Sequence, residues 1–301
     1  MIRIDDLHKS YGATAAVRGL SLAVGPGRIC GLIGPDGAGK TTTMRIVCGL
    51  LAPDRGTATV LGRDCTREAR AIKSRLGYMP QRFSLYPDLT VAENLRFFAD
   101  LFAVGRQERA RREAELMEFS KLGPFRERRA GRLSGGMKQK LALSCTLIHT
   151  PEVLVLDEPT TGVDPVSRRE FWRILRDLAN RGLALLVSTP YLDEADLCDD
   201  IVLMHGGRAI ARGTPAEVAA GFPRRLLEVR GPGLSAAIAL LRETPVAGTD
   251  ARRYGDRLHV VYTDQDQAAA VRARLAGLAV EVSPVGPGIE DAFVALLEGA
   301  S

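Results

Sequence analysis

The hydrophobic positions of residues 1–24 alternate with polar ones, and this period of two predicts antiparallel strands. After the turn Gly25-Pro26-Gly27, residues 29–33 form a short apolar run that is typical of a buried strand. Residues 153–156 form a second run of this kind. Continuous apolar runs are typical of strands buried in parallel sheets, so we expect residues 153–157 to form such a strand.

From Thr90 onward the apolar residues follow the period of a helix. The residues predicted on one face are Val91, Leu95, Phe98, Leu101 and Phe102, and the pattern continues through Leu116, Phe119 and Leu122. We therefore predict a helical subdomain at about residues 86–150. Two arginine clusters in it, residues 106–112 and 126–132, are interpreted as solvated helix faces because no aromatic residues interleave them, so no nucleic-acid partner is expected.

The last 80 residues show alternating strand and helix patterns. Segments near residues 226–229, 234–241, 257–261, 265–275 and 279–282 predict the order strand, helix, two strands, helix, strand. This order suggests a small α+β, ferredoxin-like domain at 222–301, after a first domain at 1–221. The closing residues 289–297 form an amphipathic helix. No site chemistry is visible here, and a packing or dimer-stabilising role is favoured over ligand sensing.

The chain has 301 residues and a net charge of +5, and its composition is that of a globular protein. The charge permits an anionic partner but selects none. No segment reaches the roughly 20 apolar residues of a membrane span, and the N-terminus lacks the apolar core of a signal peptide, so a cytosolic location is expected. The five cysteines have no metal-ligand spacing and are interpreted as reduced core thiols: Cys30, Cys48, Cys65, Cys145 and Cys198.

A glycine-rich loop follows the apolar run at residues 29–33 and precedes a helical pattern. It consists of Gly34, Pro35, Asp36, Gly37, Ala38, Gly39, Lys40, Thr41 and Thr42, and fits G-x-x-x-x-G-K-[ST]. Glycines allow backbone N–H groups to approach a triphosphate, and the helix end adds partial positive charge. Lys40 is predicted to reach the β- and γ-phosphates, and the Thr41 hydroxyl to bind Mg²⁺.

Two carboxylates, Asp157 and Glu158, end the second apolar strand. In phosphoryl transfer such a pair suits two tasks: Asp157 holds Mg²⁺ and Glu158 polarises the attacking water. Gln81, after another predicted strand, has the chemistry to bind Mg²⁺ or orient water, although alone it reads as a turn residue. Tyr11 is either an adenine-stacking ring or a half-buried strand residue.

A serine and two glycines, Ser134, Gly135 and Gly136, begin a further helical pattern. They form either a second anion site or an ordinary N-cap with a tight turn. These residues, the loop at 34–42, Gln81, Leu156-Asp157-Glu158-Pro159 and Gly162-Val163-Asp164-Pro165 stand in the order and spacing of the nucleotide-binding domain of ATP-binding cassette (ABC) transporters. The chain resembles this family over about residues 1–220.

The resemblance implies a P-loop NTPase (RecA-like) core of α/β class with an antiparallel β subdomain and a helical subdomain. It implies ATP and Mg²⁺ as cofactors, Tyr11 as the adenine-stacking residue and Gln81 as the link to a membrane partner. Residues 134–136 are implied to cap the γ-phosphate of a second cassette, and Asp164 to let the two sites sense each other. Residues 160–169 look most like exporters of drugs and antibiotics.

The resemblance therefore predicts the ATPase subunit of an exporter, bound to separate integral membrane permeases at the cytoplasmic face of the membrane. Two alternatives from other classes are a soluble ABC ATPase acting on nucleic acid or ribosomes and a regulatory subunit that binds ATP without hydrolysis. Soluble ABC ATPases of the first kind usually carry two cassettes in one chain, whereas this chain carries one. Intact Glu158 argues against complete loss of hydrolysis.

The sequence departs from the family pattern at two positions. Asp36 replaces a common asparagine and adds a carboxylate near the phosphates, which should weaken binding slightly unless the side chain points to solvent. Pro190 stands where the family has a histidine that donates to the γ-phosphate, and proline has no donor. We expect this chain's own site to turn over slowly and a second cassette to complete a heterodimer, although a slow homodimer or rescue by Tyr191 stays open.

Overall fold

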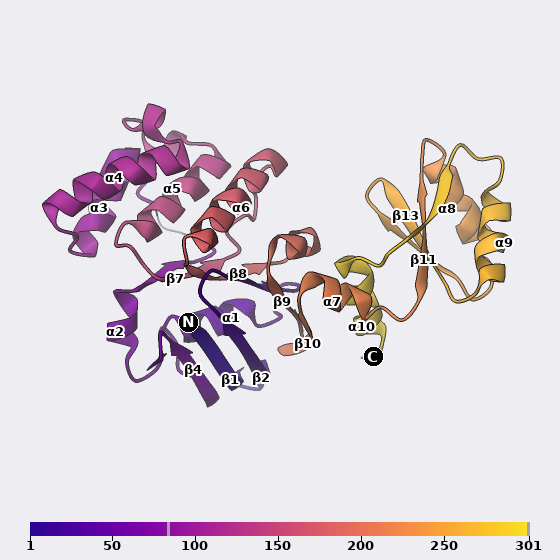
Figure 1. Cartoon of the computed structure of the whole chain (residues 1–301), viewed down its shortest axis with the longest axis horizontal. Coiled ribbons are helices and arrows are strands. Elements are labelled where there is room, and N and C mark those ends of the chain that lie inside the picture. The colour runs from indigo at the N-terminus through magenta and orange to yellow at the C-terminus, as the bar shows by residue number, and fades with distance from the viewer. Residues whose placement is uncertain (83–84, 300–301) are drawn as a thin grey trace. The chain divides into compact units, whose positions relative to one another are not determined.

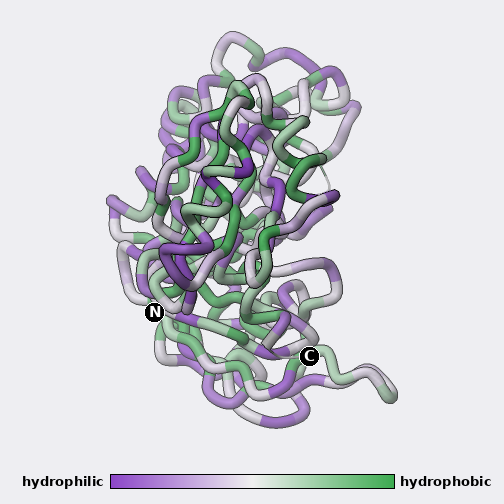
Figure 2. Tube along the Cα trace, turned by 90° about the vertical axis from the view of Figure 1, so that its right-hand side faces the viewer, coloured by the Kyte–Doolittle hydropathy of each residue, from purple (hydrophilic) through white to green (hydrophobic). Residues whose placement is uncertain are grey.

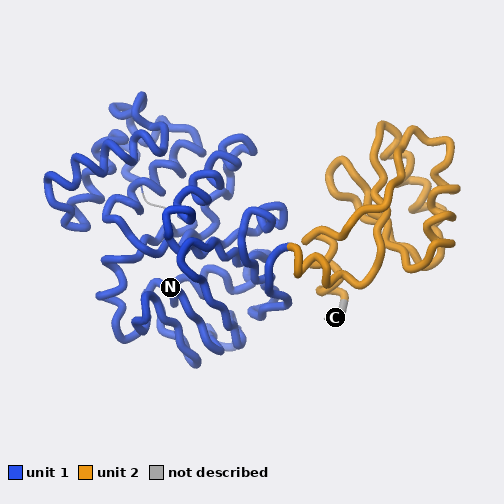
Figure 3. Tube along the Cα trace, viewed as in Figure 1, with its two compact units in different colours: residues 1–215 blue, residues 216–301 orange. Residues whose placement is uncertain are grey.

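The structure, a computed structural model, describes residues 1–82 and 85–299. The chain forms two compact units, residues 1–215 and 216–301 (Figure 3). The predicted boundary at residue 221 lies slightly later, because the short helix α7 (Pro215–Ala220) belongs almost entirely to the second unit.

An antiparallel sheet opens the first unit, as the alternating pattern predicts. Its strands lie in the order β2-β1-β4-β5. Their bounds are β1 Ile2–Tyr11, β2 Thr14–Val24, β4 Arg55–Val60 and β5 Arg63–Asp64. Ile2 and Ile4 of β1 are buried and alternate with exposed Arg3 and Asp5, so one face of the sheet covers the core.

A second sheet of six strands has the order β10-β9-β3-β8-β7-β6. Its strands are β3 Ile29–Ile33, β6 Leu76–Met79, β7 Val153–Asp157, β8 Ala184–Thr189, β9 Asp200–His205 and β10 Arg208–Gly213. All neighbours are parallel except β9 and β10. Parallel strands end at the same sheet edge, and the loops after β3, β6, β7 and β8 therefore meet there.

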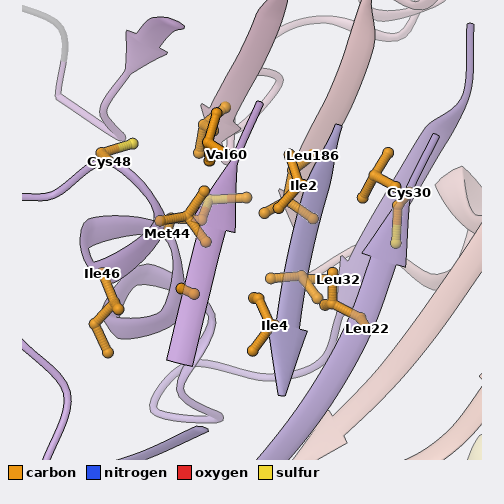
Figure 4. Close-up of a cluster of buried hydrophobic side chains, with 14 of the residues drawn as sticks. Ile2, Ile4, Leu22, Cys30, Leu32, Met44, Ile46, Cys48, Val60 and Leu186 are labelled. Atoms are coloured by element: carbon orange, nitrogen blue, oxygen red, sulfur yellow. The ribbon is translucent and has the colours of Figure 1, made fainter. Parts of the chain in front are cut away.

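The main core fills the space between these two sheets and helix α1 (Lys40–Val47) (Figure 4). Ile2 and Ile4 from β1, Leu32 from β3 and Met44 from α1 are each at most 1% exposed. Burial of side chains this large contributes roughly 1.5–3 kcal/mol each. The contacts anchor α1, and with it the preceding glycine-rich loop, against both sheets.

The remaining helices of the first unit are α2 Ala69–Lys73, α3 Val91–Leu101, α4 Arg106–Ser120, α5 Gly135–Leu147 and α6 Pro165–Asn180, of which α3, α4 and α5 pack together (Figure 1). Short 3₁₀ helices lie at Gly123–Phe125, Ala130–Arg132 and Leu192–Leu197. Thr90 and Glu93 form a capping box that begins α3.

The buried face of α3 differs from the predicted one. Val91, Leu95 and Ala99 are buried, at the spacing of four residues that a helix requires, whereas Leu101 is 64% exposed. Leu101 lies about 120° from the centre of this face because each residue turns the helix by about 100°. The helix ends at Leu101, and Phe102 just beyond it stacks on His149 instead.

Hydrophobic stretches of the chain are short and interrupted by hydrophilic residues (Figure 2), and no helix among the described residues is long and apolar enough to span a membrane. All five cysteines are free and buried, as predicted for core thiols. Burial raises the pKa of Cys30 and of Cys65 to about 12, so both are uncharged at neutral pH.

The second unit contains a four-stranded antiparallel sheet in the order β12-β13-β11-β14. Its elements after α7 are β11 Arg225–Arg230, α8 Leu234–Glu243, β12 Asp250–Tyr254, β13 Arg257–Tyr262, α9 Gln265–Leu275, β14 Glu281–Val285 and α10 Ile289–Gly299. The βαββαβ order and the central position of β11 and β13 confirm the ferredoxin-like prediction. Helices α8 and α9 cover one face of the sheet.

On the opposite face, buried His259 of β13 joins the sheet to α10. Its Nδ1 lies 2.9 Å from Asp291 Oδ1, and its Nε2 lies 3.4 Å from Glu228 Oε2. Burial disfavours the charged ring, but the hydrogen bond and negative charge of Asp291, with the hydrogen bond of Glu228, raise the pKa of His259. Arg257 contacts Glu228 at 3.6 Å, and the Tyr254 ring packs edge-on against the imidazole.

We expect the His259→Gln variant to be less stable than the wild type by about 1–3 kcal/mol at pH 6 and by less at pH 9. A raised folded-state pKa contributes stability that is complete below the unfolded value and disappears as the pH rises through the folded value. Urea unfolding of the full chain at both pH values measures the difference. Substitution of exposed His205 by glutamine is the control, and an equal loss at both pH values would contradict the charged pairing.

Candidate functional site

The glycine-rich loop runs from the end of β3 to the start of α1 and is fixed by close backbone contacts. A Cβ on Gly34 would lie 2.2 Å from the Met204 carbonyl oxygen, and one on Gly39 would lie 2.3 Å from that of Ala16. Gly39 also has φ +101°, which side chains rarely adopt. Both positions therefore require glycine, and the loop stands closely packed against β2 and β9.

A cavity of about 620 Å³ opens beside this loop. Its volume lies within the range of small-molecule sites, roughly 300–1,000 Å³. The predicted residues that line it are Tyr11, Asp36, Gly37, Ala38, Gly39, Lys40, Thr41, Thr42, Gln81 and Glu158, and the others are Thr14, Ala15, Ala16, Arg18 and Gly206. The tertiary structure thus brings together the first strand, the glycine-rich loop and the loops after β6 and β7.

Lys40 is 3% exposed and is held by the loop itself. Its ammonium group donates to the carbonyl oxygens of Gly34 at 2.7 Å and Pro35 at 3.0 Å. It also lies 3.3 Å from Glu158 Oε1. A flexible amine with three donors can exchange such partners for phosphate oxygens, so Lys40 is the cation best placed for an anionic ligand in this cavity.

Asp157 and Thr41 form an oxygen-rich corner at the end of β7. Asp157 Oδ1 accepts hydrogen bonds from Thr41 Oγ1 at 3.1 Å and from Ser188 Oγ at 2.6 Å. Asp157 Oδ2 is buried and has no hydrogen-bond partner. Buried polar atoms are rarely left unpaired, and Mg²⁺ prefers oxygen ligands and retains several waters. The corner therefore fits Mg²⁺, with Thr41 and Asp157 as the residues that would hold it.

Glu158 is 5% exposed and adopts φ +50°, a strained conformation for a residue other than glycine. Its Oε2 accepts from Gln81 Nε2 at 2.8 Å and from Thr161 Oγ1 at 3.3 Å, and its backbone N–H donates to Ser188 Oγ at 2.9 Å. These bonds fix the carboxylate between Lys40 and Gln81, where it faces the cavity. Gln81 thus contacts Glu158 directly.

The remaining predicted site residues do not line the cavity: Gly34, Pro35 and Asp157 bind the lining residues Lys40 and Thr41, and the others lie at the starts of two helices. Ser134 caps α5, where its side chain accepts from the Met137 N–H at 3.4 Å, and Gly135 and Gly136 form the first turn. Asp164 caps α6, where hydrogen bonds from the Ser167 and Val166 N–H groups lower its pKa. A Cβ on Gly136 would lie 2.5 Å from that of Ser167, so the two helix starts are in contact.

Pro190 directly follows β8, at the edge where the other loops meet. Its neighbour Tyr191 donates its backbone N–H to Thr189 Oγ1 at 3.1 Å, and the Arg168 guanidinium stacks over the Tyr191 ring at 4.2 Å from the centroid. Among the described residues, those that line the cavity include no histidine. Pro190 supplies no donor from its own side chain or backbone nitrogen.

Two contributors to the site escaped the sequence analysis. Ser188 bridges Asp157 and Glu158 from the neighbouring strand β8. Arg18 brings a cationic side chain from β2 to the cavity wall. Ser188 lies in an apolar strand next to the anomalous Pro190, which is a weak signal, and Arg18 resembles any polar residue of an alternating strand. Only the pairing of the strands reveals their positions.

A family model described as "ABC transporter" matches residues 17–161 of this chain. The chain is 43% identical over 303 residues to the probable multidrug ABC transporter ATP-binding protein YbhF of Escherichia coli (strain K12), covering 100% of this chain and 52% of that protein. It thus spans about half the length of this relative. It is 40% identical to the daunorubicin resistance ATP-binding protein DrrA3 of Streptomyces coeruleorubidus, covering 98% of this chain and 95% of the relative.

A solved structure described as the ATP binding subunit of an ABC transporter also has a similar fold. It is 29% identical in sequence, with a TM-score of 0.66, and the match covers 74% of this chain and 93% of the other. The shared fold accounts for the α/β core with its parallel sheet.

Proposed function

Because the chain belongs to the ABC transporter family, we propose that it is the ATP-binding subunit of an ABC exporter, which hydrolyses ATP to drive transport through separate membrane permeases. The observation that carries this proposal is that Lys40 and Glu158 line one cavity of about 620 Å³, and that Thr41, which also lines it, donates a hydrogen bond to Asp157. Relatives named for multidrug transport and daunorubicin resistance support export of drug-like compounds.

The predicted residues at and beside the cavity have the following proposed tasks. Tyr11 stacks on the adenine, the N–H groups of residues 34–42 and the Lys40 ammonium bind the phosphates, and Glu158 orients and polarises the attacking water. Gln81 positions the Glu158 carboxylate through their hydrogen bond. Mg²⁺, held by Thr41 and Asp157, would neutralise charge on the β- and γ-phosphates. The enclosed carboxylate and ammonium act in a site largely shielded from water.

Residues 134–136 and Asp164 act in a dimer of cassettes. Their separation from the cavity within one chain supports a role at the cavity of a second cassette, where the N-terminus of α5 meets the γ-phosphate. ATP closes the dimer and hydrolysis reopens it. The permease partners place the cassette at the cytoplasmic face of the membrane.

This chain's own cavity hydrolyses ATP slowly because Pro190 provides no γ-phosphate donor. A heterodimer with a second cassette resolves the deficit, since residues 134–136 of this chain can complete the partner's site. The proposal thus describes an asymmetric pair in which one site turns over faster than the other.

The proposed assembly is tested by purifying the tagged chain from its native membranes and identifying every stoichiometric partner. We expect permease chains and a second cassette that carries a histidine at the position of Pro190. Permeases with this chain alone would replace the heterodimer by a homodimer. Recovery without any membrane protein would overturn the exporter function and favour a soluble ABC ATPase.

A further inference from the structure

Glu194 is a buried carboxylate that has no task in the mechanism above. It lies in the 3₁₀ helix Leu192–Leu197, directly after the loop of Pro190, and is 1% exposed. A buried carboxylate is strongly unfavourable unless charged or hydrogen-bonding groups compensate it. Its partners therefore indicate what the side chain does.

The Glu194 carboxylate joins the segment before it, which carries Thr189, to two segments more than 20 residues earlier in the chain, which carry Thr160 and Arg168. Its Oε1 accepts from Thr160 Oγ1 at 2.8 Å, and its Oε2 accepts from Thr189 Oγ1 at 2.5 Å. Arg168 Nε of α6 lies 3.7 Å from Oε1. Both threonines are themselves buried, so the two bonds are shielded from water.

Each of these segments carries a residue of the proposed reaction. Thr160 follows Glu158 by two positions, and Thr189 immediately precedes Pro190. Arg168 lies one helical turn beyond Asp164 on α6 and stacks on Tyr191. Glu194 itself does not line the nucleotide cavity. Its carboxylate is thus hydrogen-bonded to the loop after Glu158 and to the strand end before Pro190, but it is part of neither the nucleotide cavity nor the proposed Mg²⁺ site.

We infer that Glu194 is a positioning residue for hydrolysis, which ties the loop that carries Glu158 to the loop that carries Pro190. This role rests on the proposed ATPase function. The strained backbone of Glu158 makes such a tie useful, because a left-handed conformation at a residue other than glycine persists only where the surroundings hold it. The hydrogen bond from the Glu158 N–H to Ser188 Oγ already ties this loop to β8. The bond between Glu194 and Thr160 adds a second tie two residues further along the loop.

A positioning role predicts a change in turnover with little change in nucleotide binding. Loosening the Glu158 loop misplaces the carboxylate relative to the attacking water, whereas Lys40 and the glycine-rich loop still bind the phosphates. A merely structural role predicts a loss of stability with no selective effect on kcat. The comparison of kcat with KM therefore separates the two roles.

The experiment measures steady-state ATP hydrolysis by the purified full chain and by its Glu194→Ala variant. We expect kcat to fall by about 10- to 100-fold, because removal of a side chain that holds a site residue commonly reduces activity by this factor. We expect KM for ATP to change by less than about threefold. The matched control is Glu113→Ala, since Glu113 is also a buried glutamate, 8% exposed, but lies on α4. Thermal unfolding of both variants measures any general loss of stability.

Single substitutions of the two hydroxyl donors extend the test. Thr160→Val and Thr189→Val are each expected to lower kcat, and the double variant is expected to lose less than the product of the two, because both remove parts of the same tie. The Glu194→Gln variant retains an acceptor and keeps more activity than Glu194→Ala.

A kcat of Glu194→Ala within twofold of the wild type, or a drop that Glu113→Ala reproduces, would overturn the positioning role while the ATPase function stands. A wild-type chain that binds ATP and never hydrolyses it, alone or with its membrane partners, would instead overturn the proposed ATPase function and this role with it.

Discussion

The Glu158→Gln variant is expected to hydrolyse ATP about 10²- to 10⁴-fold more slowly than the wild type while it still binds ATP. Glutamine has nearly the same shape and keeps an acceptor for the Gln81 and Thr161 hydrogen bonds. It lacks the negative charge that polarises the attacking water. Loss of this charge also removes a repulsion toward the phosphates, so the affinity for ATP should be equal or higher.

Single-turnover hydrolysis and equilibrium binding of a fluorescent ATP analogue together measure this effect. Glu152→Gln is a suitable control, because Glu152 precedes the same strand β7 but forms a surface ion pair with Arg75. Unchanged turnover in Glu158→Gln, or a parallel loss of nucleotide binding, would contradict the assignment of Glu158 to the water.

The Pro190→His variant is expected to hydrolyse ATP about 10²- to 10³-fold faster than the wild type, equivalent to roughly 2.7–4 kcal/mol of transition-state stabilisation. A histidine at this position would supply the donor to the γ-phosphate that proline lacks. Position 190 directly follows β8 at the same sheet edge as Asp157 and Glu158, so the new side chain starts from the correct edge. Thr189 and Tyr191 on either side are unchanged.

Pro190→Ala separates the gain of a donor from the loss of the proline ring. It is expected to match the slow wild type, since alanine has no side-chain donor. The ATPase rate of the purified chain is measured for all three proteins. If the histidine variant is no faster than the alanine variant, Pro190 does not limit turnover, and the case for an asymmetric pair loses its main support.

Much of the site was predictable because its key residues are adjacent in sequence. The nine-residue loop at 34–42 and the pair Asp157 and Glu158 each show a local pattern that has few other physical explanations. Helix and strand periods also predicted the antiparallel opening, the buried strands and the ferredoxin-like order of the second unit. Local patterns of this kind depend on backbone geometry and solvent exposure, which a few neighbouring residues determine.

The remaining contacts were not predictable because they join residues far apart in the chain. Ser188 bridges Asp157 and Glu158 only because β8 pairs with β7 in one register. The buried face of α3 was predicted to include Leu101, yet packing against α5 selects the stripe of Val91, Leu95 and Ala99. A hydrophobic pattern limits which face is buried, but the neighbouring element decides it.

The sequence by itself determined which chemical groups this protein carries: a glycine-rich loop with a lysine, two acids at a strand end and a proline where a donor is expected. The tertiary structure decided which of these groups meet. Lys40 lies against Glu158, Gln81 reaches the same carboxylate, and residues 134–136 stay outside the cavity. The physical reason is that the chemistry of a side chain depends only on its residue type, whereas the distance between two side chains depends on strand order and register. Strand order and register form only when the whole core packs.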